Sequence, residues 1–347
     1  MKVALITGSC GLVGSEASIF FYKKGFKIIG IDNNYRKFFF GKDGDINWVK
    51  TKLKNLKNYT HFGIDIRNYN NLEKIFQKYR KKIKVIVHAA AQPSHDWAKN
   101  QPFIDFNINA KGTLNLLELT RIYSSKAPFI YMSTNKVYGD NPNKLPLKET
   151  KTRWEIKKSH KYFSGIDETM SIDNCTHSFF GSSKSYADLI VQEYGKNVGL
   201  NTVCFRGGCI TGPNHSGAKL HGFLSYLVKS CLSKKKYSLI GYKGKQVRDN
   251  LHSNDLINCF WEFFKKPKKG AIYNIGGGRY SNCSILEAIE IIEKECQIHI
   301  KKNLIKSPRV GDHIWYISNN SKFKKDYPKW KQKYNTKKII AELIDNS

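Results

Sequence analysis

Three glycines near the N-terminus have the spacing of a turn that binds phosphate. Gly8, Gly11 and Gly14 follow the apolar run Val3 to Ile6 and open a segment of helical periodicity, residues 12–22. Glycines in such a turn permit a tight bend, the approach of a pyrophosphate to the backbone, and close packing of the helix on the strand. The start of the helix offers unpaired N–H groups and the positive end of its dipole to the phosphates.

A carboxylate follows at the distance expected of a dinucleotide site. The next apolar segment, Phe26 to Ile31, ends in Asp32, which lies 18 residues beyond Gly14. A carboxylate there accepts hydrogen bonds from ribose hydroxyls and repels a 2′-phosphate. We therefore expect NAD rather than NADP as the cofactor, although Arg36 lies nearby.

The elements that must position these residues alternate between strands and helices. Apolar runs predict strands near residues 3–6, 26–31, 61–64, 85–88, 129–132 and 202–206, and helical periodicity predicts helices near 12–22, 46–56, 68–79, 102–123 and 183–198. The pattern predicts an α/β fold, a Rossmann-type doubly wound parallel sheet with a smaller C-terminal substrate-binding lobe.

The expected domain boundary falls after residue 206. Residues 1–206 are predicted to form the NAD-binding domain, with a long active-site loop at 140–176, because that stretch is polar and lacks periodicity. From residue 207 onward glycine, proline and aromatic residues become frequent between short elements, which predicts the smaller lobe, residues 207–347, with some interleaving of chain segments.

Composition limits the compartment and the partners. No apolar run is long enough to span a bilayer, and the first strand begins at once, so we expect a cytoplasmic protein without a membrane segment or signal peptide. Eight cysteines occur without a Cys-x-x-Cys pair, which favours reduced thiols over a metal site.

The charge is strongly basic, with a formal net charge of +31, but only nine of the 59 basic residues are arginines. Lysines spread over most segments favour a solvated surface over specific nucleic-acid binding.

Three further motifs occur in a fixed order along the chain. They are Asn107-Ile-Asn-Ala-Lys-Gly-Thr113 within a predicted helix, Ser133-Thr-Asn-Lys-Val-Tyr-Gly139 after a predicted strand, and Gly181-Ser-Ser-Lys184 at a helix start. With the N-terminal glycines, this order resembles the extended short-chain dehydrogenase/reductase superfamily, in its NAD-dependent epimerase/dehydratase family. The run at 133–140, Gly244-Lys-Gln-Val-Arg-Asp249 and His252 are most similar to the CDP-paratose 2-epimerase (CDP-tyvelose epimerase) group, and the resemblance extends to Arg309-Val-Gly-Asp312.

The resemblance implies a reaction cycle and a set of site residues. Tightly held NAD would remove a hydride from C2 of a CDP- or UDP-linked sugar and return it to the opposite face. Lys184 would anchor the nicotinamide ribose, and Thr134 would bind the reacting hydroxyl. The residues expected in the cofactor site are Gly8, Cys10, Gly11, Leu12, Val13, Gly14, Asp32, Asn33, Arg36, Asp65, Ile66, Ala89, Ala90, Ala91, Asn109, Ser133 and Lys184.

The substrate site is expected in both parts of the chain. Arg248 and Arg309 are candidates for the substrate diphosphate, because an arginine fork matches phosphate oxygens; surface ion pairs are the competing interpretation. The full expected set is Thr134, Asn135, Lys136, His221, Gln246, Arg248 and Arg309.

One position departs from the family pattern. The family places a tyrosine four residues before the lysine, and the residue there is Phe180. A phenyl ring cannot accept a proton, so the usual base is missing. Its place would be taken by His177, by Tyr186, or by Thr134 with water. Alternatively, the reaction differs, or the protein binds NAD and a nucleotide sugar without turnover. A histidine titrates near neutrality and suits this task, although an ordinary loop position is the favoured interpretation of His177.

Other activities remain open at this point. A 4,6-dehydratase needs an acid/base pair beside the threonine, and Asn135 and Lys136 stand there instead. A C4 epimerase or a sugar dehydrogenase is compatible with the fold and cofactor site. By the resemblance, segments 102–123 and 183–198 would pair two chains in a homo-oligomer.

Overall fold

The computed structural model describes residues 1–215, 222–233, 236–309 and 311–346, which divide into two compact units. The first unit comprises residues 1–137, 179–206 and 257–273, and the second comprises 138–178, 207–256 and 274–347. The chain thus passes between the units at residue 206, where the sequence suggests a boundary. The segment expected to be an active-site loop, 140–176, groups with the second unit.

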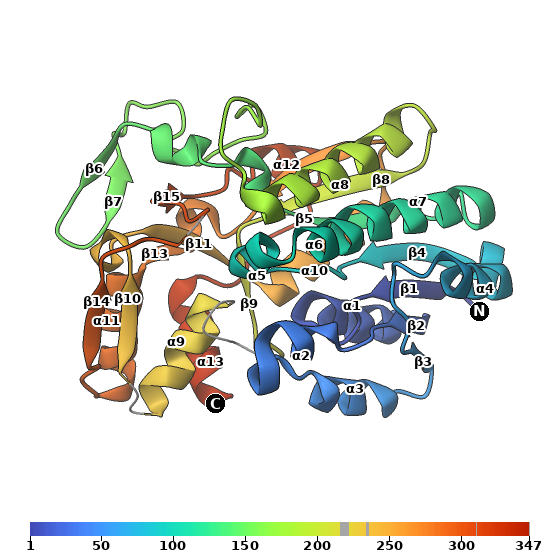
Figure 1. Cartoon of the computed structure of the whole chain (residues 1–347), viewed down its shortest axis with the longest axis horizontal. Helices are drawn as coiled ribbons and strands as arrows, with labels where there is room; N and C mark the ends of the chain where they lie inside the picture. The colour runs from blue at the N-terminus through green and yellow to red at the C-terminus, as the bar shows by residue number, and fades with distance from the viewer. Residues whose placement is uncertain (216–221, 234–235, 310, 347) are drawn as a thin grey trace. The chain divides into compact units, whose positions relative to one another are not determined.

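The first unit is built on a seven-stranded sheet (Figure 1). Its strands are β1 (Val3–Thr7), β2 (Lys27–Ile31), β3 (Tyr59–Phe62), β4 (Ile83–His88), β5 (Phe129–Thr134), β8 (Thr202–Gly207) and β12 (Ala271–Ile275), in the order β12-β8-β5-β4-β1-β2-β3. β1 pairs in parallel with β2 and β4, β2 with β3, and β4 with β5. The strand order reverses between β1 and β4, and ligands bind at such a switch point, beyond the carboxyl ends of the strands.

Helices follow the strands as predicted. They are α1 (Leu12–Lys23), α2 (Tyr35–Phe40), α3 (Asn47–Lys54), α4 (Tyr69–Tyr79), α5 (His95–Asn100), α6 (Pro102–Phe106), α7 (Gly112–Tyr123), α8 (Ser178–Lys196) and α10 (Ser253–Lys265). A π-helical turn, Asn107–Lys111, joins α6 to α7. The predicted α/β fold with a parallel sheet is confirmed. No helix in the described part of the chain is long and apolar enough to cross a membrane.

Both faces of the sheet are covered, and β1 is accordingly apolar from Val3 to Ile6 and buried along its whole length. Val3 and Leu5 belong to a core cluster that includes Leu72 of α4 and Leu116 of α7. A separate aromatic group joins α1 to α10 within this unit: the ring of Phe21 lies 6.0 Å from that of Trp261 and 6.1 Å from that of Phe264, in edge-to-face contacts.

The second unit has short strands and its own helical core. Its strands are β6 (Leu147–Glu149), β7 (Trp154–Ile156), β9 (Cys209–Thr211), β10 (Tyr237–Ile240), β11 (Val247–His252), β13 (Asn282–Ser284), β14 (Lys302–Ile305) and β15 (Trp315–Tyr316). Its helices are α9 (Phe223–Leu232), α11 (Ile285–Cys296), α12 (Ser321–Asp326) and α13 (Thr336–Asp345). Apolar residues of α9, α11 and α13 form one buried cluster.

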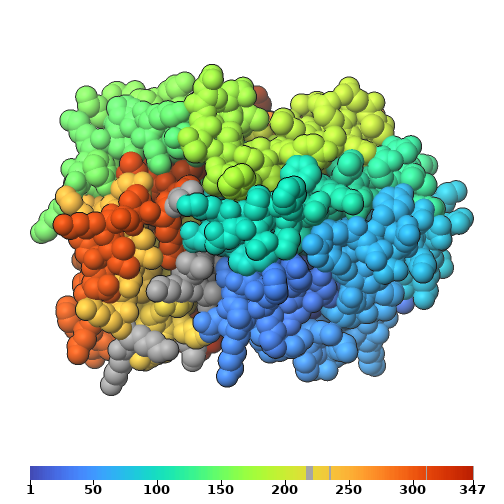
Figure 2. All heavy atoms as spheres, in the orientation of Figure 1, coloured from blue at the N-terminus to red at the C-terminus, as the bar shows by residue number. Residues whose placement is uncertain are grey.

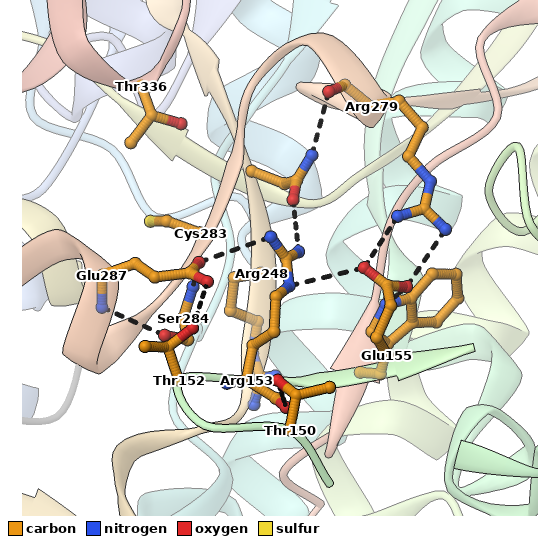
Figure 3. Close-up of polar contacts among 12 residues, drawn as sticks. Thr150, Thr152, Arg153, Glu155, Arg248, Arg279, Cys283, Ser284, Glu287 and Thr336 are labelled. Carbon is orange, nitrogen blue, oxygen red and sulfur yellow. Dashed lines mark hydrogen bonds and ion pairs between the residues drawn. The ribbon is translucent and has the colours of Figure 1, made fainter. Parts of the chain in front are cut away.

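A hairpin replaces part of the loop expected at 140–176. β6 and β7 pair antiparallel, and ion pairs hold the hairpin to the rest of the second unit (Figure 3). The Arg153 guanidinium lies 3.4 Å from carboxylate oxygens of both Glu155 and Glu287, and Arg279 Nη1 donates a 2.9 Å hydrogen bond to Glu155 Oε2. The segment lacks periodicity in sequence because these contacts with distant residues, rather than a local pattern, organise it.

Candidate functional site

The glycine turn lies at the switch point of the sheet, and a side chain at two of its glycines would clash with the backbone. Gly8 has a φ of 65°, and a Cβ there would lie 2.7 Å from the main-chain nitrogen of Ala90. A Cβ on Gly14 would lie 2.0 Å from the carbonyl oxygen of Gly8. Gly11 is the N-cap of α1 and no side chain caps the helix, so the first turn presents main-chain N–H groups. This cradle fits the pyrophosphate of a dinucleotide.

The Asp32 carboxylate stands beside this turn at the end of β2. Oδ2 accepts a 3.0 Å hydrogen bond from the main-chain N–H of Cys10, and Oδ1 accepts a 2.8 Å bond from that of Asn34. Burial raises the pKa of Asp32, while the two N–H donors and the charge of Lys50 act in the opposite direction. The fixed carboxylate can accept further bonds from ribose hydroxyls on its remaining lone pairs.

A cavity of about 110 Å³ adjoins this carboxylate; it is lined by Cys10, Asp32, Asn33, Asn34, Ile46, Asn47, Lys50, His61 and Gly63. Burial, helped by the nearby charges of Lys50 and Lys54, lowers the pKa of His61 to about 4, so its imidazole is neutral near pH 7. Burial likewise raises the pKa of Cys10 to about 12, which keeps its thiol protonated. Among the lining residues, Asp32 is the only carboxylic acid and Lys50 the only side chain with an amino group.

Asp65, Asn33 and Arg36 lie near the same strand ends. Asn33 Nδ2 donates a 3.0 Å hydrogen bond to Asp65 Oδ2, and Arg67 Nη2 pairs with the same oxygen at 2.7 Å. Although burial opposes it, the hydrogen bonds and charge of Arg67 lower the pKa of Asp65. The Arg36 guanidinium stacks 4.8 Å from the ring centroid of Phe40, and burial lowers its pKa to about 10.

Lys184 is buried in α8 and bound to the end of β5. Nζ donates a 2.9 Å hydrogen bond to the carbonyl oxygen of Met132 and lies 4.3 Å from the ring centroid of Tyr131. Burial lowers the pKa of Lys184 to about 8, and the negative charge of Asp188 is the largest opposing influence. The ammonium is therefore mostly charged near pH 7.

The residues after β5 are held in a tight turn. Thr134 Oγ1 accepts a 3.2 Å hydrogen bond from the Lys136 N–H and donates a 3.4 Å bond to Asn135 Oδ1. Ser133 Oγ donates to the Asp188 carboxylate of α8. The end of β5 and the helix that carries Lys184 are thus joined by direct side-chain bonds.

Asn109 ties the strand-end turn after β4 to α8. Its Oδ1 accepts a 2.9 Å bond from the Gln92 N–H, and its Nδ2 donates 3.1 Å bonds to the Gln92 carbonyl and to Ser183 Oγ. Ser183 Oγ in turn lies 3.1 Å from the carbonyl oxygen of Phe180, to which it donates. Asn109 belongs to the π-helical turn, a feature that is frequent at functional sites.

Phe180 is in contact with a residue that the sequence analysis did not single out. The ring of His95, the first residue of α5, lies 4.8 Å from the Phe180 ring, centroid to centroid, at an interplanar angle of 66°. Phe180 is buried and His95 is half-buried. The sequence offered one hint: His95 stands four residues beyond Ala91, the last alanine of the strand-end run.

Several other expected residues belong to the second unit. The imidazole of His177 lies 3.6 Å from Cys175 Sγ. Gln246 Nε2 donates a 2.9 Å bond to the Ile240 carbonyl, while its buried Oε1 has no hydrogen-bond partner among the described residues. His221 falls outside the described residues.

The two arginines expected to bind phosphate have protein partners of their own. Arg248 Nη1 donates a 2.8 Å bond to the Val247 carbonyl, and its Nη2 pairs with the Asp312 carboxylate. Arg309 lies close enough to Tyr237 for its charge to oppose the rise that burial causes in the pKa of that phenol. In the described structure, Arg248 is thus already engaged with a carboxylate that an anionic ligand would have to displace or share.

The fold and the glycine cradle define a dinucleotide-binding enzyme, and comparison with known proteins gives its family. The sequence profile of the NAD dependent epimerase/dehydratase family matches residues 4–276. The chain belongs to this family, as its motifs predict, and NAD is the cofactor of the family. It is 32% identical to the CDP-paratose 2-epimerase of Salmonella typhi over 98% of both chains, and 27% identical to the UDP-glucuronate 4-epimerase of Thermodesulfobacterium geofontis over 85% of this chain and 80% of that protein.

Solved structures have the same fold over the whole chain. UDP-glucuronic acid 4-epimerase from Bacillus cereus, in complex with UDP-glucuronic acid and NAD, superposes with a TM-score of 0.80 at 23% identity and covers 99% of this chain and 98% of its own. dTDP-glucose 4,6-dehydratase from Bacillus anthracis, in complex with NAD, gives 0.78 at 23% identity, with 100% and 96% covered.

Proposed function

We propose that this enzyme is a nucleotide-sugar epimerase that oxidises C2 of a CDP-linked deoxysugar transiently, in the manner of CDP-paratose to CDP-tyvelose. The observation that carries the proposal is the 32% identity to a CDP-paratose 2-epimerase along 98% of both chains. Asn135 and Lys136, beside Thr134, support it further, because a dehydratase needs an acid/base pair there.

In this proposal the first unit holds the cofactor. The glycine cradle binds the pyrophosphate, the Asp32 carboxylate accepts bonds from the adenosine ribose, and the Lys184 ammonium donates to the nicotinamide ribose. When bound, NAD supplies the acceptor and donor of hydride for the sugar carbon. The hydroxyl of Thr134 orients the reacting hydroxyl of the sugar. Because the cofactor ends each cycle in its starting state, no second substrate is consumed.

The second unit supplies groups for the nucleotide in this proposal. Arg248 and Arg309 bind the diphosphate through charge-assisted hydrogen bonds, with Arg248 exchanging its bond to Asp312 for one to phosphate. Gln246 presents a buried amide oxygen without a partner among the described residues, and such an acceptor suits an N–H donor of a nucleobase.

Two alternatives have specific support. A C4 epimerase or a dehydrogenase is compatible with the same cofactor site, and UDP-glucuronate 4-epimerases are among the relatives at lower identity. A protein that binds NAD and a nucleotide sugar without turnover is favoured by one observation alone, the phenyl ring of Phe180 where the family pattern has a tyrosine.

The test separates these functions with one preparation. The protein is purified without added ligand, denatured, and its released nucleotides are identified by mass spectrometry; a second portion is incubated with CDP-paratose without added NAD and followed by NMR. Near-stoichiometric NAD and formation of the C2 epimer support the proposal. Turnover only with added NAD favours a dehydrogenase, and retained NAD without turnover of CDP-paratose or UDP-glucuronic acid favours the binding protein.

We also propose that two copies of the chain associate through α6 and α8. These helices lie side by side at the surface of the first unit (Figure 2), and the rings of Phe106 and Tyr186 meet at 5.8 Å. Phe103, one turn before Phe106, is 83% exposed, and Leu189, one turn after Tyr186, is 46% exposed. An apolar face of this kind marks a protein interface in soluble proteins.

A further inference from the structure

We propose that the imidazole of His95 is the general acid and base of the reaction and replaces the tyrosine hydroxyl that Phe180 lacks. This inference rests on the proposed function, because it assigns the proton transfer of that same reaction. Its basis is the edge-to-face contact of the two rings, 4.8 Å between centroids. The contact places the imidazole ring beside the aromatic position from which the family tyrosine would act, and imidazole is the side chain used most often for this task.

The ring pair is held by a buried hydrogen-bond network. Asn109 binds the main chain of Gln92 at both N–H and carbonyl, and through Ser183 it reaches the Phe180 carbonyl. Gln92 Oε1 accepts the N–H of Ser94, and Ser94 Oγ caps α5, the helix that the histidine begins. One asparagine therefore fixes the backbone on both sides of the contact, which is the preorganisation that a proton-transfer group needs.

Three other groups near this position are engaged elsewhere. The Lys184 ammonium donates to Met132 and, while protonated, has no lone pair to accept a proton. Tyr186 is exposed and packs on the ring of Phe106 at the outer surface of the first unit. Thr134 already accepts a bond from Lys136 N–H, and an aliphatic hydroxyl is too weak a base to act alone.

His95 accounts for both the proton removed and the proton returned in each cycle. In the oxidation, an unprotonated ring nitrogen of His95 takes the proton of the C2 hydroxyl while the C2–H bond breaks and its hydride passes to the bound nicotinamide; the C–O bond becomes a carbonyl. In the return step the hydride re-enters at the opposite face of C2, and the imidazolium gives its proton to the carbonyl oxygen. Protein and cofactor end as they began, and no further reactant is required.

The first experiment replaces the histidine and then restores a tyrosine. His95→Gln, which keeps a polar side chain of similar length, should lower kcat about 100-fold or more. The NAD released on denaturation and the affinity for CDP-paratose should stay within about twofold, since the proposed role lies in proton transfer. The double variant Phe180→Tyr/His95→Gln should have a kcat at least tenfold higher than that of His95→Gln alone. His299→Gln, at an exposed site, is the matched control and should be as active as the wild type.

The second measurement does not depend on turnover. Diethyl pyrocarbonate modifies accessible imidazoles, and peptide mass spectrometry follows His95 separately from the other histidines. CDP-paratose should slow modification of His95 at least fivefold and leave His299 unaffected. Two outcomes would overturn this inference and leave the proposed function standing, provided that the wild type is active as an epimerase. One is a His95→Gln variant as active as the wild type, and the other is a His95 that CDP-paratose does not protect. A wild type without turnover of CDP-paratose overturns both.

Discussion

The ammonium of Lys184 donates a 2.9 Å hydrogen bond to the carbonyl oxygen of Met132, so α8 is fastened to the last residues of β5. The bond fixes the lysine at the carboxyl end of a central strand, where ligands bind in open α/β sheets. Burial of the same ammonium lowers its pKa to about 8, and this shift gives the lysine a measurable signature in the stability of the protein.

Lys184→Met should change the pH dependence of stability. The folded-state pKa lies below the ordinary value of 10.5, so between about pH 8 and 10.5 the unfolded chain binds more protons and the stability of the wild type rises with pH. The variant lacks this rise. Its free energy of unfolding relative to the wild type should therefore fall by on the order of 3 kcal/mol across that range, which urea unfolding at several pH values measures.

The same variant tests the proposed role in cofactor binding. Loss of the ammonium should reduce the NAD retained after purification at least tenfold, because a charge-assisted hydrogen bond to the ribose is removed. Lys126→Met, at an exposed position, should change neither quantity. Full NAD retention in Lys184→Met would show that the lysine does not bind the cofactor.

Asp32→Asn should shift the cofactor preference. The substitution keeps the size of the side chain but removes the charge that binds ribose hydroxyls and repels a 2′-phosphate. We expect NAD to bind about 10-fold to 100-fold more weakly, which corresponds to loss of one charged hydrogen bond, and NADP to gain relative to NAD. Titration of the stripped protein with each nucleotide measures both, with Asp43→Asn, exposed in the same region, as the control. An unchanged ratio of affinities would show that Asp32 does not select the cofactor.

The strands and the glycine turn could be predicted from sequence because their signals are local. A buried strand in a parallel sheet is a short apolar run, and the turn needs glycines at positions where a side chain would strike the backbone, as at Gly14. The expected acid at the end of β2 is likewise defined by its distance from that turn. In the structure Asp32 lies at the end of β2, and its carboxylate accepts a hydrogen bond from the N–H of Cys10 in that turn.

The His95 contact could not be predicted because it joins residues 85 positions apart and leaves no periodic pattern. From the sequence alone, His177 was the candidate imidazole, because it stands three residues before Phe180 and a histidine titrates near neutrality. The hairpin within 140–176 was missed for a similar reason: Arg153 and Glu287 are far apart in the sequence and are brought together only by the folded second unit (Figure 3).

Asp188→Asn should destabilise the first unit. The carboxylate pairs with Arg206 Nη2 at 2.8 Å, and both side chains are at most 4% exposed. Removing one partner of a buried ion pair leaves the other charge unpaired and costs about 3–5 kcal/mol. The urea midpoint should fall accordingly, and the double variant Asp188→Leu/Arg206→Met should be more stable than Asp188→Asn alone because it leaves no unpaired guanidinium at position 206. A loss below about 1 kcal/mol in the single variant would contradict this account.

The same substitution should affect Lys184, one helical turn away in α8. Asp188 is the largest influence that raises the pKa of the lysine against the effect of burial. With a neutral asparagine, the pKa of Lys184 should fall further below about 8, and the pH at which the stability begins to rise should move down with it. The free energy of unfolding of Asp188→Asn is compared at each pH with that of Lys184→Met, which lacks the lysine, so that the titration of Lys184 is separated from that of other groups.

Leu189→Glu should separate a pair of chains if α6 and α8 form the proposed interface. A carboxylate placed on the apolar face next to Tyr186 loses its hydration when that face is buried, and in a symmetric pair two such charges come close together. Light scattering should then give a mass near the 39.9 kDa of one chain, against twice that value for the wild type. Leu304→Glu alters a leucine that is 50% exposed in the second unit and should leave the mass unchanged. A wild type that is monomeric at micromolar concentration, or a Leu189→Glu variant that remains paired, would rule out this face as the interface.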